Sequence, residues 1–444
     1  MKSRLISLVA ALALVVVPSA GAGTAFFVRG GGWGHGIGMS QWGAYGQALN
    51  GRSYDTILAH YYRGTALGEI SNVSLGVILA SGRSSLTIGS NARFTVTGAG
   101  GKTWTLGARD HTFGPDLRLR TVSGRWVTLS SPASFRPGNA KLRLNGSYYR
   151  GSFGVASNGT SLSAVNHLSM ESYLRGVVAR ESPASWPLEA LKAQAVAARS
   201  YAYVSIQGGR YLYPDTRDQV YGGVAAETGA TDRAVSDTRR QVVTYNGSVV
   251  QAFFFSSSGG RTASIADEWG SSPVPYLVSV KDPWDRYSPY HRWGSFRYTT
   301  RGIASHVTVP RGFNDMVVNR NGSGRAASVD LIGSSTRRVT GSSFRSAFNL
   351  RSTRFWISVL RLSASHPKTR PCKGAVRLSG FERREKPGLG VQQRLVGGVW
   401  QTAASGINPN PDGTFVVCAN PTATTFYRPV SSHGAGKTIR VDPS

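Results

Sequence analysis

The feature that most constrains the fold is a helix–break–helix block at residues 169–205. Residues 169–179 have a helical pattern, residues 180–187 carry two prolines that interrupt it, and residues 188–205 predict a long helix with six alanines. Alanine has the highest helix propensity, and its small side chain lets other elements pack closely. A chain with this block at its centre is not an all-β protein.

Short strand-like runs lie on both sides of the block. Between residues 72 and 168, apolar and polar residues alternate in runs broken by Gly, Ser and Asn, which predict strands at 73–79, 94–96, 126–129, 141–144 and 148–153. Further on, VVTYNGSVV predicts a hairpin with a type I′ turn at Asn246-Gly247, and residues 342–349 predict a helix. We therefore expect an α+β fold, a mixed strand-rich domain around a central alanine-rich helix with an insertion of short strands.

A glycine-rich segment precedes the strands. Residues 26–64 read FFVRGGGWGHGIGMSQWGAYGQALNGRSYDTILAHYYRG, and the first half contains too much glycine for a helix. The second half predicts two short helices, at 40–49 and 54–62, and Ser53 is the expected cap of the second.

The first 22 residues predict the compartment. Lys2 and Arg4 precede an apolar run of about 13 residues at 5–17, and Ala20-Gly21-Ala22 fits an A-x-A cleavage site. This run is shorter than the ~20 residues that span a bilayer. We expect a signal peptide at 1–22 and a secreted, wall-associated protein with no transmembrane segment.

The charge balance predicts an anionic partner. The chain has 51 Lys and Arg against 22 Asp and Glu, a formal net charge of +29. With 40% hydrophobic and only 16% charged residues, it has the composition of a folded protein and not of a disordered one. Secretion argues against nucleic acid, so the expected anionic partner is a membrane surface or an acidic cell-wall polymer, held by a salt-sensitive interaction.

The two cysteines, Cys372 and Cys418, lie in the last quarter of the chain. In an oxidising compartment they are expected to form one disulfide. The proline-containing stretch before them predicts a linker, and the residues after it predict strands, at 375–378, 390–395, 414–418 and 424–427. We expect a small C-terminal all-β domain, Ig-like or similar.

Glu181 is the clearest candidate for a catalytic residue. The sequence contains no Walker A loop, no H-E-x-x-H and no G-x-S-x-G motif. Glu181 follows an apolar run and precedes a Ser-Pro step, with Trp186 nearby. Desolvation beside an indole favours a neutral carboxyl, which is the state a general acid needs. Alternatively, Glu181 is a surface residue paired with Arg180 or Arg199.

Several long motifs resemble the SpoIID/LytB family, the relatives of stage II sporulation protein D. They are ESYLRGVVARESPASWPLEALKAQAVAARSYA, DQVYGG with Glu227, SSSGGRTAS with Trp269, and PYLVSVKDPWD. The block GWGHGIGMSQWGAYGQALNGRSYDTILAHYYRG is similar to the segment that closes the family's domain. The resemblance covers about residues 26–360.

The order of these segments implies a circular permutation. In the family, the glycine–histidine block follows a segment like GSSFRSAFNLRSTRFWI, whereas here that segment is at 341–357 and the block comes first. Residues 30–62 are therefore expected to pack beside residues 344–357 and the helix at 188–205. The implied organisation is a signal peptide at 1–22, a permuted glycine/His block at 23–68, a SpoIID-like catalytic domain at 69–361, a linker at 362–371 and a small β domain at 372–444.

The resemblance implies peptidoglycan chemistry at Glu181. SpoIID-type proteins are lytic transglycosylases, acting preferably on glycan strands stripped of peptide, and the Glu of their E-x-P-A-x-W-P motif is the catalytic acid. Carried over to ESPASWP, that acid is Glu181. It would protonate the oxygen leaving N-acetylmuramate and then accept the proton of the sugar's own 6-hydroxyl, giving a 1,6-anhydro end without a second carboxylate.

Other residues are expected to contact the glycan. His35 lies among glycines where backbone can approach a sugar, and Ser40 and Gln41 suit N-acetyl groups. Arg199 is expected to hold a lactyl carboxylate. Four more residues are expected to line the cleft: Tyr201, Tyr221, Ser257 and Ser258.

The same resemblance bears on metals and partners. Some family members hold zinc with cysteines and a histidine near the segment that corresponds here to YPDTRDQVY, which contains neither residue type. We therefore expect no metal and no cofactor. The family also includes amidase enhancers, so the alternative function is a non-catalytic basic wall-binding module that assists a partner N-acetylmuramoyl-L-alanine amidase.

Overall fold

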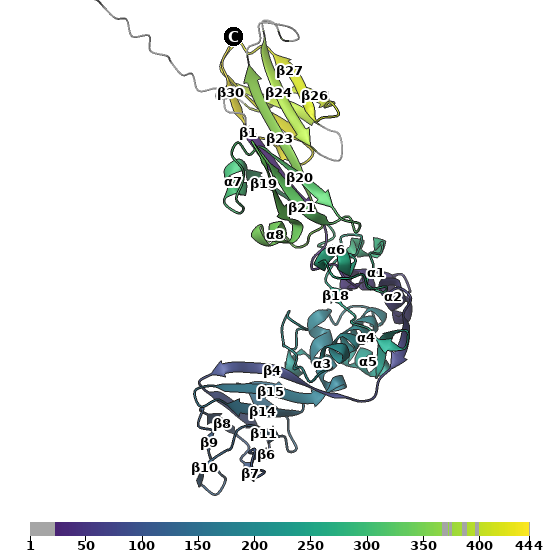
Figure 1. Ribbon diagram of the computed structural model, residues 1–444, viewed down its shortest axis with the longest axis vertical. Coiled ribbons are helices and arrows are strands. Elements are labelled where there is room, and N and C mark those ends of the chain that lie inside the picture. Colours follow the sequence, from purple (N-terminus) through teal and green to yellow (C-terminus); the bar gives the residue numbers. More distant parts are fainter. Residues whose placement is uncertain (1–22, 366–371, 373–374, 384–388, 396–398, 444) are drawn as a thin grey trace, which may run out of the picture.

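The computed structural model describes residues 23–365, 372, 375–383, 389–395 and 399–443. The predicted signal peptide lies outside these residues. The fold is mixed α+β, as predicted, and Figure 1 shows an elongated, curved molecule with strands at both ends and most of the helices between them. No helix in the described ranges is both long and apolar enough to cross a membrane.

The alanine-rich helix α4 (Leu188–Ser205) is the centre of the helical region. Helices α1 (Gln41–Leu49), α2 (Tyr54–Tyr61), α3 (Met170–Glu181) and α5 (Gly229–Asp237) all pack against it. All six alanines of α4 are buried, and their small side chains allow this close approach from several sides.

Serine caps begin two of these helices. Ser40 accepts a hydrogen bond from the N–H of Gly43 in α1, and Ser169 accepts one from Ser172 in α3. Ser53 is the N-cap residue of α2, as predicted, but its hydroxyl bonds the Thr56 hydroxyl at 3.0 Å and makes no cap hydrogen bond. Helix α3 also continues two residues further than predicted, so Glu181 is its last residue.

Residues 74–169 form an inserted β-module at one end of the molecule (Figure 1). A six-stranded sheet of order β4-β15-β14-β11-β6-β7 packs with a four-stranded sheet of order β13-β12-β5-β8, and β9 and β10 form a separate ribbon. The strands are β4 (Ser74–Arg83), β5 (Leu86–Ser90), β6 (Phe94–Thr97), β7 (Thr103–Leu106), β8 (Asp110–Phe113), β9 (Arg118–Arg120), β10 (Trp126–Thr128), β11 (Ala133–Arg136), β12 (Leu142–Leu144), β13 (Ser147–Tyr149), β14 (Ser152–Ser157) and β15 (Leu162–Ser169).

One predicted strand of this module is two strands. The run at 148–153 is interrupted by a turn between β13 and β14, where Gly151 has a φ of +79°. Glycine adopts this left-handed conformation without steric cost. An added Cβ there would also meet the carbonyl oxygen of His167, so the turn requires glycine.

Strand β1 (Gly23–Gly30) lies in the middle of a sheet built from the far end of the chain. It pairs antiparallel with β19 (Trp293–Thr299) on one side and β23 (Phe355–Ser365) on the other. The Gly31 N–H also donates to the Arg354 carbonyl at 2.9 Å. Together with the packing of α1 and α2 on α4, this confirms the neighbours predicted for residues 30–62.

Smaller sheets and helices complete the middle of the molecule. The Asn246-Gly247 hairpin is confirmed, with φ values of 49° and 79° at these residues. The elements here are β2 (Met39–Ser40), β3 (Ala66–Glu69), η1 (Gly223–Ala226), β16 (Gln241–Tyr245), β17 (Ser248–Val249), β18 (Phe254–Phe255), α6 (Ile265–Trp269), η2 (Pro283–Tyr287), α7 (Thr300–Ala304), β20 (Asp315–Arg320), β21 (Ala326–Ile332), β22 (Thr336–Thr340) and α8 (Gly341–Ala347).

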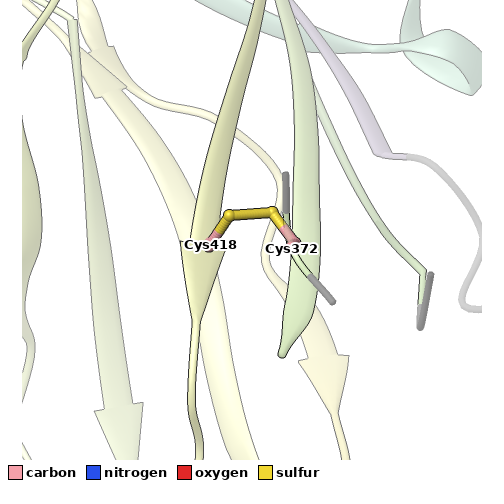
Figure 2. The surroundings of a disulfide bond; sticks show 2 residues. All are labelled: Cys372 and Cys418. Carbon is pink, nitrogen blue, oxygen red and sulfur yellow. A yellow bond between two sulfur atoms is a disulfide. The ribbon is translucent and has the colours of Figure 1, made fainter. Parts of the chain in front are cut away.

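The C-terminal strands continue the sheet that contains β1. Strand β24 pairs with β23 and β27 pairs with β24, and the remaining described strands of this region form a second sheet around β25 and β28. Figure 2 shows the predicted disulfide between Cys372 and Cys418, whose Cα atoms are 5.3 Å apart. The strands are β24 (Val376–Arg383), β25 (Leu389–Leu395), β26 (Gln401–Ile407), β27 (Thr414–Ala419), β28 (Thr425–Ser431), β29 (Gly434–Ala435) and β30 (Ile439–Val441).

The predicted linker at 362–371 was wrong in its first four residues. They are the end of β23, where Leu362 pairs with Gly380 of β24, and residues 366–371 lie outside the described ranges. Residues 362–365 form a strand because the sheet that contains β1 and β23 packs against a hydrophobic core on each of its faces. Ala25 and Phe27 face the core of the C-terminal strands, whereas Phe26 and Val28 face the core over β20 and β21.

Candidate active site

Glu181 is held by groups from two other segments of the chain. It is the last residue of α3 and is partly exposed. Its Oε1 accepts a hydrogen bond from the Val220 N–H at 2.9 Å, and its Oε2 accepts one from Gln41 Nε2 at 3.2 Å. Helix α3, the loop before η1 and the first turn of α1 therefore meet at this carboxyl group.

The surroundings of Glu181 favour a protonated carboxyl group. Burial raises the pKa of Glu181, and the hydrogen bonds from Val220 and Gln41 partly oppose that rise. Glu181 makes no ion pair with any described residue, so the alternative of a surface pair with Arg180 or Arg199 was wrong. Arg199 instead forms a bidentate pair with Glu171, at 3.0 and 2.8 Å.

A group of aromatic side chains comes mostly from the segments next to Gln41 and Glu181 in the chain. The Trp186 ring lies 5.0 Å from the Trp42 ring and 4.9 Å from the Tyr45 ring, measured between centroids, and Tyr45 contacts Tyr287 at 6.2 Å. Trp42 and Tyr45 are on α1 beside Gln41, and Trp186 is in the break after Glu181. All four are partly exposed, and we call them the aromatic surface.

Three predicted contact residues are instead part of a buried hydrogen-bond network around Asp285. The Asp285 carboxylate accepts hydrogen bonds from Ser40 Oγ at 3.2 Å, Ser257 Oγ at 2.8 Å and the Ser258 N–H at 2.8 Å. It also accepts one from the Gly259 N–H at 2.9 Å. All three serines are completely buried, so the prediction that they contact a glycan was wrong.

A second carboxyl group, Asp282, lies next to this network. It is also completely buried and accepts a hydrogen bond from the Tyr61 hydroxyl at 3.0 Å. Burial and the charge of Asp285 raise the pKa of Asp282 to about 7. His291 Nδ1 contacts Asp285 Oδ2 at 2.8 Å from the other side. The network joins η2 to the start of α1 and so determines where Gln41 lies.

His35 is engaged through both of its ring nitrogens. Nδ1 accepts a hydrogen bond from the Ile37 N–H and Nε2 donates one to the Phe254 carbonyl, each at 3.1 Å. This pattern requires the neutral Nε2–H tautomer. Burial and the nearby Arg325 lower the pKa of His35 to about 4. His35 was expected to contact the glycan, but neither of its ring nitrogens is available for a hydrogen bond to a sugar.

The remaining predicted contacts also bond to groups of the protein itself, two of them in its interior and Tyr201 at a partly exposed position. Arg199 is completely buried, and Tyr221 donates its hydroxyl hydrogen to Asn166 in the core at 2.9 Å. The Tyr201 hydroxyl donates to Asp218 at 3.0 Å. Of the predicted contact residues, the structure brings only Gln41 to the carboxyl group of Glu181.

The sequence interpretation missed most of the aromatic surface and both buried aspartates. The spacing of Trp42 and Tyr45, three residues apart on a predicted helix, could have placed them on one face. The two acids in KDPWD, Asp282 and Asp285, gave no sign of burial. No group of His, Cys, Asp and Glu among the described residues is arranged to hold a metal ion.

Comparison with known proteins relates this chain to bacterial proteins of sporulation and amidase control. It is 49% identical over 113 residues to the amidase enhancer of Bacillus subtilis (strain 168), covering 25% of this chain and 15% of that protein. It is 37% identical over 153 residues to stage II sporulation protein D of the same organism, covering 30% and 44%. An uncharacterized protein of Brachyspira hyodysenteriae is 38% identical over 142 residues, covering 31% and 38%. The matched part thus spans less than half of each relative, and no solved structure matches.

The family comparison matches the region that carries Glu181. Residues 158–245 match the family described as SpoIID, stage II sporulation protein. This range contains α3, α4 and the Val220 loop. The chain therefore carries a domain of the SpoIID family, as the resemblance of its motifs predicted.

Proposed function

We propose that this protein is a secreted lytic transglycosylase of peptidoglycan, with Glu181 as its catalytic acid and base. It would cleave the bond between N-acetylmuramate and N-acetylglucosamine in glycan strands, preferably strands without peptides. The names of its relatives, an amidase enhancer and a sporulation protein, support a role at the cell wall.

The observation that carries the proposal is the environment of one carboxyl group. Glu181 is partly exposed, makes no ion pair within the described residues, and has a pKa raised by burial. Its oxygens are held by two neutral donors, the Val220 N–H and the Gln41 amide. Burial favours the acid form before the reaction, and the two donors stabilise the carboxylate formed during it.

In the proposed reaction Glu181 donates one proton and later accepts one. Glu181 protonates the glycosidic oxygen as the bond to C1 of N-acetylmuramate breaks. The resulting carboxylate then removes the proton of the 6-hydroxyl of that sugar, and this oxygen bonds to C1. The products are a free 4-hydroxyl and a 1,6-anhydro end, with Glu181 protonated again and no water consumed.

A hydrolase would need a second carboxyl group to activate water. Asp282 and Asp285 are the acids behind α1, and both are completely buried and engaged in hydrogen bonds. The aromatic surface offers flat rings on which the C–H faces of sugars can pack. The burial of the two acids supports the transglycosylase over a hydrolase, and the aromatic surface supports glycan binding in either case.

A second candidate is the non-catalytic enhancer of a partner amidase. It is favoured by the 49% identity to a relative that is named an amidase enhancer. In this function Glu181 would have a structural role only, joining α3 to α1 through Gln41.

Digestion of peptidoglycan distinguishes the transglycosylase from the non-catalytic enhancer. Intact and amidase-stripped sacculi would be treated with the wild type, Glu181→Gln, and the control Glu69→Gln, whose side chain is exposed on β3. Mass spectrometry should find 1,6-anhydro-muramyl ends with the wild type and the control and none with Glu181→Gln. Reducing ends would indicate a hydrolase. Wall binding without cleavage by any variant would favour the enhancer, which a partner-amidase assay then tests.

A further inference from the structure

The inserted β-module carries a large excess of positive charge. Between residues 74 and 169 the sequence has eleven Lys and Arg residues and only two acidic ones, Asp110 and Asp116. The module lies at the opposite end of the molecule from the C-terminal strands (Figure 1). Its cations therefore form a charged region separate from the rest of the chain.

Most of these cations have no acidic partner. Arg143 pairs with Asp110 at 2.6 Å and Arg150 pairs with Glu227 at 2.6 Å. The other nine are exposed and make no ion pair with described residues: Arg83, Arg93, Lys102, Arg109, Arg118, Arg120, Arg125, Arg136 and Lys141. Nine unpaired cations on one module repel one another, and binding of an external polyanion would reduce that repulsion.

The β9–β10 ribbon orders three of these cations around an exposed indole. Arg118 and Arg120 are on the outer face of β9, because Leu119 between them is buried. Arg120 is opposite Trp126 of β10, and the Arg118 guanidinium lies 5.3 Å from the centre of the Trp126 ring. Trp126 is 59% exposed, and Arg125 precedes it in the turn.

The spacing on β9 fits a repeating phosphate polymer. Residues two apart on one face of a strand are separated by about 6.6 Å, so two guanidinium groups can reach successive phosphates of one chain. Guanidinium groups bind phosphate oxygens through paired N–H donors. The exposed Trp126 ring can pack on the sugar or polyol unit between those phosphates.

We propose that the inserted β-module docks on a linear phosphodiester polymer of the cell wall, with Arg118, Arg120, Arg125 and Trp126 as the centre of the contact. A lipid bilayer fits less well, because Val122 is the one large aliphatic residue exposed at the ribbon tip. The nine exposed cations also come from strands and turns throughout the module, whereas a bilayer would need them at the ribbon tip. This docking is independent of the chemistry proposed at Glu181.

Binding of the mature protein to poly(glycerol phosphate) tests the proposal. The variants are the triple Arg118→Gln/Arg120→Gln/Arg125→Gln and a charge-matched control, Arg63→Gln/Arg239→Gln/Arg301→Gln, which removes exposed arginines outside the module. At about 0.1 M salt the ribbon variant should bind roughly tenfold or more weakly and with a smaller salt dependence, while the control stays near wild type. Trp126→Ala should weaken binding without changing the salt dependence.

Three results would overturn the docking. An equal loss in the two triple variants would mean that only net charge matters. Binding to anionic vesicles but not to the polymer would assign the surface to a membrane. No binding to either would remove the ribbon as a docking surface. Glu181→Gln should bind like the wild type, so failure of the proposed enzyme activity would leave this test unaffected.

Discussion

Gln41 and Glu181 are 140 positions apart in the chain, and a 3.2 Å hydrogen bond joins their side chains. Gln41 is the first residue of α1, and the residue before it, Ser40, both caps that helix and donates to Asp285. The buried network around Asp285 therefore positions the amide that contacts the proposed catalytic acid.

Removing this amide should shift the pH dependence of activity. The hydrogen bond from Gln41 lowers the pKa of Glu181, so Gln41→Ala should raise it further. Because the reaction starts from protonated Glu181, activity falls as pH rises through this pKa, and the variant should retain activity to higher pH. The measurement is the rate of anhydro-end formation from pH 4 to 9. The exposed Ser53→Ala is the control, and an unshifted profile for Gln41→Ala would contradict the role.

Asp282 should make the protein less stable as pH rises. Its folded pKa of about 7 exceeds the ordinary value of 3.8. Between these values the folded protein holds a proton that the unfolded chain has released, so stability declines from about pH 4 to pH 7. Asp282→Asn should remove this decline, with a gain of at most roughly 4 kcal/mol at pH 8. Urea unfolding at pH 5 and pH 8 measures it. A wild-type stability that rises over this range, with no change in Asp282→Asn, would contradict the assignment.

Replacing Arg199 should reduce stability and leave substrate affinity unchanged. Arg199 is completely buried against Glu171, so Arg199→Met leaves an uncompensated carboxylate at a cost of roughly 3–5 kcal/mol. The exposed pair Arg217–Asp215 gives a control, Arg217→Met, that should unfold like the wild type. Denaturant unfolding and KM for glycan strands are the two measurements. A raised KM with normal stability would instead support the contact with a lactyl carboxylate that the resemblance implied.

The aromatic surface should contribute to glycan binding. Trp186 contacts both Trp42 and Tyr45, and its loss removes the central ring of the group. Trp186→Ala should raise KM about fivefold, because an aromatic contact contributes on the order of 1 kcal/mol. Trp186→Phe should restore most of the affinity. If Trp186→Ala lowered kcat alone, the ring would act on the position of Glu181 and not on the sugar.

Local signals in the sequence predicted the helices and most strands well. Helix α4 spans the predicted residues, because helix propensity acts over a few neighbouring residues. The end of β23 was assigned to a linker because nothing local shows that Leu362 pairs with Gly380.

The site was harder to predict for the same physical reason. A serine before two glycines has the same local signal whether its hydroxyl faces solvent or, like Ser257, a buried Asp285. Likewise, the partner of Arg199 is on another helix, and the tautomer of His35 depends on a carbonyl 219 positions away. Glu181 was identifiable because its motif and its apolar neighbours are contiguous in the chain.

The central place of β1 has a consequence for how the protein matures. Ribosomes make this strand before its partners β19 and β23, so early in synthesis it has no sheet to join. Residues 31–38 and β2 connect β1 to α1, so the N-terminal side of the segment that carries Gln41 is held by strand pairing only after β19 and β23 have been made. Both neighbours of β1 are therefore present only in chains synthesised at least through β23.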